Sequence, residues 1–330
     1  MPPSPPTPNP DSPTPPPPGP DVPAPPRDGV GDVPYEQRTE ALRLLLTGSR
    51  HGPEHAVAPF LGFMRQQGVA IDRLVGRYVH GRLAAVCLVL PNPGRTGMVF
   101  ISPASDRRRE GLVAEATRVA VEALDPQRYR LVQALLEPTQ VAEKRALTAA
   151  GFEPLATLLY LSRPIDRVPL QWSDEERQSP LGLDTQTWSE SHRGLFERAI
   201  EASYEQTRDC PGLVGVRSLA DVIEGHMATG RFDPELWTVY HDGGEVAAVT
   251  LFAAVQGDET YELVYLGVCP AYRGHGLGRR LLQRGITAVA ARGGKRLCLA
   301  VDQDNAPARR LYTNLGFRGV SRKVAMIRTG

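Results

Sequence analysis

The stretch Pro270-Ala271-Tyr272-Arg273-Gly274-His275-Gly276-Leu277-Gly278-Arg279-Arg280 decides how the second half of the chain folds. It follows an apolar run at residues 261–268 and precedes apolar residues at helical spacing from 277 to 292. Glycines let a backbone approach a ligand closely, and the first turn of a helix presents unpaired N–H groups with a partial positive charge. The stretch therefore predicts a strand, a glycine-rich turn and a helix that together cradle a pyrophosphate.

Two common phosphate-binding motifs do not fit this stretch. A Walker loop requires Gly-Lys-Ser/Thr, which is missing here, and a dinucleotide fingerprint opens the first strand–helix unit with an acidic residue about 20 positions later. Taken alone, a glycine-rich turn is as compatible with a plain tight turn as with a ligand site. The surrounding sequence therefore has to decide between them.

The elements expected around the stretch describe a mixed sheet. Runs at 236–240 and 245–254 flank His241-Asp242-Gly243-Gly244, which is typical of a β-hairpin, and 297–301 is a continuous apolar strand whose neighbours should be parallel and buried. Asn305 is expected to cap a helix that has Pro307 in its first turn and ends at Gly316, before a closing strand from Phe317. This order predicts an α/β fold with a mixed central sheet and flanking helices, rather than a βα barrel.

Two motifs in this region resemble the GCN5-related N-acetyltransferase (GNAT) superfamily. Val268-x-Pro270-x-x-Arg273-Gly274-x-Gly276-Leu277-Gly278 is similar to its acetyl-CoA pyrophosphate motif. Val301-Asp302-x-x-Asn305-x-Pro307-Ala308-x-x-Leu311-Tyr312-x-x-x-Gly316-Phe317 is similar to the strand–helix motif that completes its cofactor groove. The resemblance implies transfer of an acetyl group from acetyl-CoA, as co-substrate, to an amine. It also implies that the pantetheine arm lies between two splayed parallel strands, 261–268 and 297–301.

The resemblance also implies roles for individual residues. The backbone of Leu266, Gly267 and Val268 should hold the acetyl carbonyl and the pantetheine amide, and Asn305 should contact pantetheine as well as cap its helix. Tyr312 stands where many members place a general acid for the thiolate leaving group, although a purely apolar packing role stays open. The residues expected to bind the pyrophosphate are Arg273, Gly274, His275, Gly276, Leu277, Gly278 and Arg279.

A general base is also required, because an alkylamine is mostly protonated at neutral pH. Glu262 is the best candidate, since a carboxylate inside an otherwise apolar strand needs a reason. Its even spacing from Leu266 and Val268 places the three side chains on one face unless a bulge intervenes. A strand-end carboxylate that faces solvent, with a water chain as the base, is the alternative. No cluster of residues has metal-ligand spacing, so no metal is expected.

The chain contains two copies of one domain. Three pairs of segments recur in the same order and at nearly the same spacing. They are Gly81-Arg82-Leu83-Ala84-Ala85-Val86 with Gly244-Glu245-Val246-Ala247-Ala248-Val249, Ile101-Ser102-Pro103 with Val268-Cys269-Pro270, and residues 144–152 with 309–317. We therefore expect a disordered proline-rich tail at 1–34, a degenerate GNAT-like domain at 35–164 and a catalytic acetyltransferase domain at 165–330.

The first copy lacks the site residues of the second. Asp106-Arg107-Arg108-Arg109-Glu110-Gly111 replaces the glycine-rich stretch, Gln140 replaces Asn305 and Leu147 replaces Tyr312. We expect a catalytically silent domain that covers the substrate cleft or stabilises the pair, although the arginine run could still attract an anion. A degraded first copy resembles a mycothiol-synthase-like layout. That enzyme type usually carries a tyrosine five residues before the asparagine, where this chain has Ala300, so the acceptor stays open.

Composition limits the expected binding partners and cellular location of the protein. A net charge of +1 disfavours general nucleic-acid and membrane-surface binding, and no apolar run approaches the length of a membrane span. Four scattered cysteines without a CxxC pair, and no visible secretory signal, predict reduced thiols in a cytoplasmic protein. The proline-rich tail is expected to be an extended leader that adds nothing to the core; binding of a partner protein is the alternative.

The sequence thus predicts an N-acetyltransferase that acts directly on the primary amine of a small molecule. Two alternatives stay open. One is an acetyltransferase for protein N-termini or lysines, and the other is a pseudoenzyme that binds acetyl-CoA without transferring its acetyl group.

Overall fold

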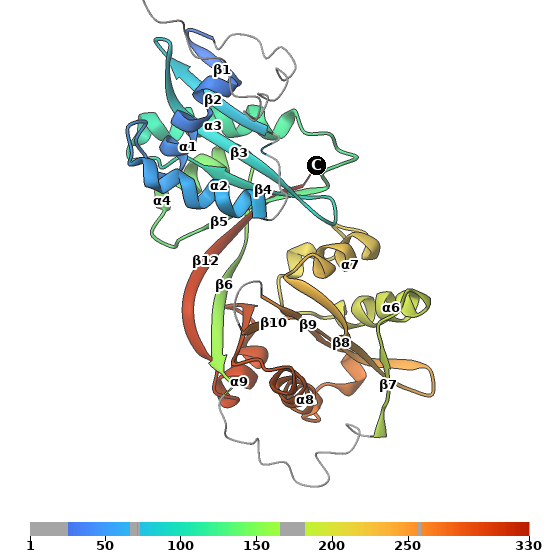
Figure 1. Cartoon of the computed structure of the whole chain (residues 1–330). Helices are drawn as coiled ribbons and strands as arrows, with labels where there is room; N and C mark the ends of the chain where they lie inside the picture. Colours follow the sequence, from blue (N-terminus) through green and yellow to red (C-terminus); the bar gives the residue numbers. More distant parts are fainter. Residues whose placement is uncertain (1–25, 67–70, 72, 166–181, 256–258, 330) are drawn as a thin grey trace, which may run out of the picture.

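The protein is described here from a computed structural model that covers residues 26–66, 71, 73–165, 182–255 and 259–329. Within this part of the chain, one twelve-stranded sheet runs through the whole molecule (Figure 1). Its strands are β1 (Gly29–Asp32), β2 (Arg73–Val79), β3 (Arg82–Asn92), β4 (Thr96–Ile101), β5 (Leu131–Leu136), β6 (Glu153–Pro164), β7 (Asp184–Thr187), β8 (Arg231–Asp242), β9 (Glu245–Ala254), β10 (Thr260–Val268), β11 (Arg296–Asp302) and β12 (Arg318–Thr329). The α-helices are α1 (Arg38–Thr47), α2 (Val57–Gln66), α3 (Arg107–Glu122), α4 (Val141–Ala149), α6 (Arg193–Tyr204), α7 (Leu219–Met227), α8 (Leu277–Ala291) and α9 (Ala306–Asn314).

The elements expected in the second half are all present. Gly243 and Gly244 both have positive φ, 54° and 100°, between β8 and β9, which is the geometry of a tight hairpin turn. The apolar stripe of α8 is buried against the sheet from Leu277 to Val289. Asn305 caps α9 as expected, because its side chain accepts a hydrogen bond from the Ala308 N–H. The predicted α/β class with a mixed sheet is confirmed.

The two halves exchange their last strands. The strand order is β1-β2-β3-β4-β5-β12-β6-β11-β10-β9-β8-β7, so the C-terminal strand β12 lies between β5 and β6 of the first half. Strand β6 in turn lies between β12 and β11 of the second half, and Figure 1 shows β6 and β12 side by side as they cross between the two bodies. Each half therefore contributes a strand to the sheet of the other. The division at residues 164 and 165 stays a prediction.

This exchange makes one sequence-based expectation wrong. Strand β11 was expected to have parallel neighbours on both sides, but only β10 is parallel to it, and β6 is antiparallel. The continuous apolar run at 297–301 indicates burial on the sheet and does not reveal which strand lies beside it. The apolar run at 297–301 therefore does not indicate that β6 of the first half pairs with β11.

Helices cover both faces of the sheet in each half. In the first half, α1 and α2 pack on one face and α3 and α4 on the other. In the second half, α6 and α7 pack on the face that carries Trp237 and Val249, whereas α8 and α9 pack on the opposite face with Phe252 and Leu263. These two faces of the second half are called here the α7 face and the α8 face.

The proline-rich segment is shorter than expected. Gly29–Asp32 forms β1, which pairs with β2, and Val33 is only 2% exposed. The expectation that residues up to 34 contribute nothing to the core is therefore wrong for this stretch, because an alternating Val-Gly pattern next to an open strand edge can extend the sheet. Residues 1–25, with any partner-binding role of the tail, lie outside the described residues.

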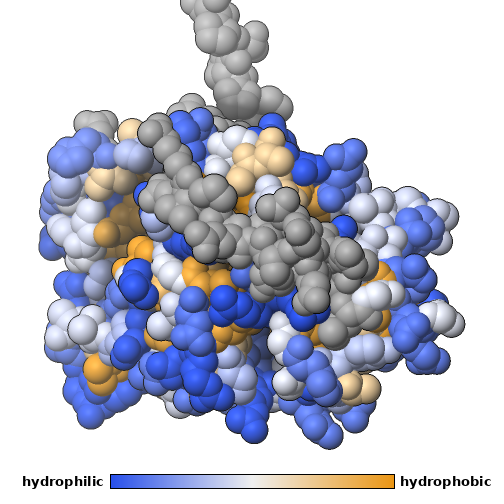
Figure 2. All heavy atoms as spheres, turned by 90° about the horizontal axis from the view of Figure 1, so that it is seen from below, coloured by the Kyte–Doolittle hydropathy of each residue, from blue (hydrophilic) through white to orange (hydrophobic). Residues whose placement is uncertain are grey.

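The surface and the thiols agree with the composition. The face drawn in Figure 2 is largely hydrophilic, and its apolar residues form separate patches where grey atoms do not cover it. All four cysteines are free, as expected. Among the described helices, none is long and apolar enough to cross a membrane. The cytoplasmic location stays a prediction.

Candidate active site

A groove opens where β10 and β11 separate. The two strands pair in parallel only from Thr260 to Glu262 on β10, and a register shift between Leu263 and Tyr265 bends β10 away from its neighbour. From there to Val268, β10 pairs with β9 alone, so its other edge faces a cavity of about 710 Å³. The groove-lining residues include the predicted backbone segment Leu266, Gly267 and Val268. The predicted splay of two parallel strands is present.

The glycine-rich loop brings an uncapped helix end to this groove. Gly274 and Gly276 have φ angles of 82° and 76°, and a Cβ added at either would meet only open space. Gly276 is the N-cap of α8 and has no side chain to occupy the free N–H groups that follow. A bound anion can therefore take these donors, with the helix dipole in its favour.

Several arginines line the groove near the start of α8. The predicted pyrophosphate residues that line the groove are Arg273, Gly274, Gly276, Leu277, Gly278 and Arg279. Two arginines that the motif did not indicate, Arg208 and Arg310, also line it from other elements. The resulting positive charge suits a phosphorylated ligand.

The side chains of two predicted residues differ from the others: Arg273 lines the groove but is hydrogen-bonded within the protein, and His275 lies outside the lining. The guanidinium of Arg273 donates to the backbone carbonyls of Val268 (2.9 Å) and Ser203 (3.0 Å), so it fastens α6 to the end of β10. His275 is exposed and is not among the groove-lining residues. The motif specified these residue types, whereas their side-chain directions depend on tertiary contacts.

Tyr312 lies at the inner part of the groove. Its side chain is 7% exposed, its ring packs 5.8 Å from that of Phe317, and its hydroxyl has no hydrogen bond to another described residue. Burial, together with the charge of Asp209, raises the pKa of Tyr312 above its ordinary value. Tyr312 therefore stays protonated at neutral pH and can donate a proton into the groove, while its ring belongs to the core.

Glu262 occupies a different face from the one expected. The bulge after Leu263 shifts the alternation, so Leu266 and Val268 pack on the α8 face whereas Glu262 points to the α7 face. Its carboxylate is half-buried and lies outside the groove lining, next to the point where the strands separate. Burial raises the pKa of Glu262. A base at this position would act from the α7 side of the sheet.

A loop residue that sequence reasoning did not assign also enters the groove. The carboxylate of Asp209 accepts a hydrogen bond from the Asp302 N–H (2.9 Å), and Asp302 accepts one from the Cys210 N–H (3.2 Å). This reciprocal pair fastens the loop after α6 to the end of β11. Asp209 also hydrogen-bonds Asn305, and removal from water raises its pKa. Neither of the two GNAT-like motifs includes this loop, so they did not indicate Asp209.

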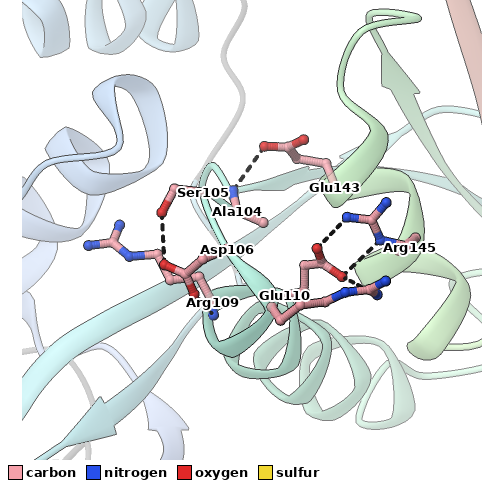
Figure 3. A network of polar contacts seen from close by, with 8 residues as sticks. Ala104, Ser105, Asp106, Arg109, Glu110, Glu143 and Arg145 are labelled. Atoms are coloured by element: carbon pink, nitrogen blue, oxygen red, sulfur yellow. Dashed lines mark hydrogen bonds and ion pairs between the residues drawn. The ribbon is translucent and has the colours of Figure 1, made fainter.

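The corresponding place in the first half is filled by the chain itself. Figure 3 shows Asp106 at the start of α3, where its carboxylate accepts from the Arg109 N–H (2.9 Å), so the helix end that is free in α8 is capped here. Glu143 accepts from the Ala104 N–H (2.9 Å), and Glu110 is held by Arg145. A cavity of about 410 Å³ remains beside this cap, lined in part by arginines. An anion would have to compete with Asp106 for the helix end.

Among the described residues, no metal site accompanies the groove. Within the part of the chain that the structure describes, no group of three or more His, Cys, Asp or Glu side chains could hold a metal ion. The groups that the site offers are therefore backbone N–H donors, a phenol, carboxylates and arginines.

Comparisons with known proteins agree with this geometry. Residues 199–317 match the Acetyltransferase (GNAT) family. The chain is 32% identical to a mycothiol acetyltransferase of Catenulispora acidiphila over 238 residues, which cover 68% of this chain and 69% of that protein. A shorter segment, 25% of this chain, is 38% identical to N-alpha-acetyltransferase 40 of Saccharomyces cerevisiae, of which it covers 36%.

A solved structure extends the similarity of fold to nearly the whole chain. The crystal structure of a GCN5-related N-acetyltransferase from Sphaerobacter thermophilus superposes with a TM-score of 0.56 at 19% identity. The superposition covers 92% of this chain and 96% of that one, so both halves share its architecture. With a groove of the GNAT type, a family match and a relative that aligns across both halves, the chain belongs to the GNAT family and is an acetyltransferase of that family.

Proposed function

We propose that this enzyme transfers an acetyl group from acetyl-CoA directly to the primary amine of a small molecule. The observation that carries the proposal is the groove itself. It runs from an uncapped helix N-terminus with arginines at its mouth to a protonated Tyr312 inside, and Glu262 stands where its two strands meet. The helix N-terminus and the arginines suit the phosphates of acetyl-CoA, the groove suits its pantetheine arm, and Tyr312 suits its thioester end.

Acetyl-CoA fits the residues present. Bare backbone at Gly274 and Gly276 leaves room for phosphate oxygens beside the N–H groups that begin α8, with Arg279 adding a full charge. The unpaired edge of β10 near Leu266 offers N–H groups to a carbonyl that becomes an oxyanion during acyl transfer. By the same comparison, the first half is proposed to leave acetyl-CoA unbound, because Asp106 occupies its helix end.

The proposed reaction uses two proton-transfer groups. Glu262 takes a proton from the ammonium, and the free amine attacks the thioester carbon. The C–S bond then breaks, and Tyr312 supplies a proton to the departing thiolate. Overall the ammonium nitrogen loses two protons; one ends on the thiol of CoA and the other is released to solvent.

The acceptor is proposed from the relatives. Because the chain aligns across both halves with a mycothiol acetyltransferase, the deacetylated sugar thiol is the first acceptor to test. The similarity of a shorter segment to a yeast N-alpha-acetyltransferase makes a peptide N-terminus the competing acceptor.

Radiolabelled acetyl-CoA, offered with deacetylated mycothiol, a peptide with a free N-terminus or no amine, tests the proposal. We expect label in the sugar thiol alone, and a Tyr312→Phe variant should lose this transfer. Label in the peptide alone would assign a protein substrate. Binding of acetyl-CoA without transfer to any amine would contradict the proposed reaction and favour a pseudoenzyme.

A further inference from the structure

The strand exchange brings a side chain of the first half next to the groove of the second. On β6, Tyr160 lies directly opposite Ala300 of β11, and Ala300 is exposed and lines the groove. Residues directly opposite each other in an antiparallel pair have their side chains on the same face, with Cβ atoms about 4.5–5.5 Å apart. Tyr160 therefore stands beside a position where the groove wall is reduced to a methyl group.

Glu262 is on the same face. It pairs with Cys298, which is two residues before Ala300 on β11 and shares its face. The alternate residues Leu297, Leu299 and Val301 are buried in the core of the α8 face. Tyr160 and Glu262 consequently face the same space on the α7 side of the sheet, although they come from opposite halves of the chain.

Small, exposed residues lie on both sides of Tyr160. Tyr160 has Ala300 on one side and Ser321 of β12 on the other, and both of these small residues are exposed. The Tyr160 ring itself is half-buried between them. The Tyr160 ring is therefore flanked by two small residues, and one of them, Ala300, lines the groove.

Neither the Tyr160 hydroxyl nor the Glu262 carboxylate has a hydrogen-bond partner among the described residues, although polar groups that lose contact with water normally have one. The two groups nevertheless interact: after burial, the charge of Glu262 is the second cause that raises the pKa of Tyr160. The Cys298 thiol, which is paired with Glu262 across the two strands, has its pKa raised to about 11 by burial and by Glu262, and it donates to the Tyr261 carbonyl. A carboxylate and a phenol oxygen are thus left as two acceptors for a donor from outside.

We propose that Tyr160, supplied by the first half, is a substrate-positioning residue of the acceptor site, where it and Glu262 together bind the ammonium group of the amine. An ammonium has three N–H donors, so it can donate to the carboxylate and to the phenol oxygen at once, and its charge also favours the aromatic ring. The inference rests on the proposed function.

The test compares Tyr160→Phe and Tyr160→Ala with a matched control. Tyr78→Phe removes a buried hydroxyl in the first half, where Tyr78 donates to Gln37, away from the groove. With deacetylated mycothiol as the amine, we expect Tyr160→Ala to raise the KM for the amine about 10-fold or more, because a hydrogen bond to a charged group is lost. The KM for acetyl-CoA should stay within about twofold, as in Tyr78→Phe.

The Tyr160→Phe variant separates positioning from packing. It keeps the ring and loses the oxygen, so the KM for the amine should rise, while the KM for acetyl-CoA and the Tm should stay close to those of wild type. Equal KM values for the amine in wild type and Tyr160→Ala would overturn the inference. So would an increase in both KM values accompanied by a large drop in Tm, which would indicate a structural role.

Binding measurements keep this inference separable from the proposed reaction. Calorimetric titration of deacetylated mycothiol into the full-length protein reports amine binding without catalysis. If wild type transfers no acetyl group but binds the amine more tightly than Tyr160→Ala does, the reaction assignment fails and the inference stands. If wild type transfers acetyl groups and Tyr160→Ala binds the amine equally well, the inference fails and the reaction stands.

Discussion

Replacing Tyr312 by phenylalanine should separate catalysis from stability. The hydroxyl makes no hydrogen bond to another described residue, so its removal leaves no buried partner unsatisfied, and the ring contact with Phe317 is kept. The free energy of unfolding should therefore change by no more than about 0.5 kcal/mol. Loss of a general acid should lower kcat about 10²- to 10⁴-fold, which corresponds to roughly 3–5 kcal/mol in the activation barrier.

The assay for this variant measures acetyl transfer from radiolabelled acetyl-CoA at saturating substrate, with thermal unfolding run in parallel. The KM for acetyl-CoA should stay close to that of wild type, because the proposed cofactor contacts lie mainly on the glycine-rich loop. Since the pKa of Tyr312 is raised, any alkaline limb of kcat that belongs to it must lie above pH 10 in wild type and be absent from Tyr312→Phe. A variant with kcat within about threefold of wild type would refute the general-acid role.

Three further predictions concern charge. Glu262→Gln should abolish transfer. Because burial raises the pKa of Glu262, its charged form lowers the stability of wild type at neutral pH. The variant should therefore have a higher Tm than wild type at pH 7, and the same Tm in acid, where Glu262 of wild type is protonated. Arg95→Ala should destabilise the protein by about 1–3 kcal/mol in urea, because Arg95 makes two hydrogen bonds (2.8 and 2.6 Å) to buried Asp221 of α7. Arg95 holds the pKa of Asp221 at about 2, so this contribution should be complete above pH 4 and disappear as the pH falls towards 2. Asp106→Ala should cost about 0.5–2 kcal/mol through loss of the α3 cap without lowering transfer activity.

The second half could be predicted from the sequence because its signals are local. The helical stripe of α8, the asparagine cap of α9 and the glycine pair between β8 and β9 each specify a geometry within a few residues. The groove followed from the same motifs, and the structure places most of the predicted cofactor residues along it. The motifs therefore determine where acetyl-CoA is expected to lie.

The strand exchange, the face of Glu262 and the position of Asp209 depend on tertiary contacts. The hydrophobic periodicity of strands and helices does not specify such contacts. Alternation along β6 and β12 indicates strands but not their partners, so the exchange, and with it the position of Tyr160, had no signal. One bulged residue after Leu263 was enough to move Glu262 to the opposite face. Asp209 reaches the groove from a loop whose path is set by its bond to Asp302.

Calorimetric titration of acetyl-CoA into the full-length protein tests whether the chain has a single acetyl-CoA site, in its second half. Wild type should bind one equivalent, and a Gly276→Glu/Gly278→Glu variant should bind none, because new carboxylates would occupy the start of α8 as Asp106 occupies the start of α3. Two equivalents in wild type, with one remaining in the variant, would show that the first half also binds the cofactor. One equivalent in both proteins would contradict the placement of the site at the start of α8. Absence of binding in wild type would contradict the assignment of the groove.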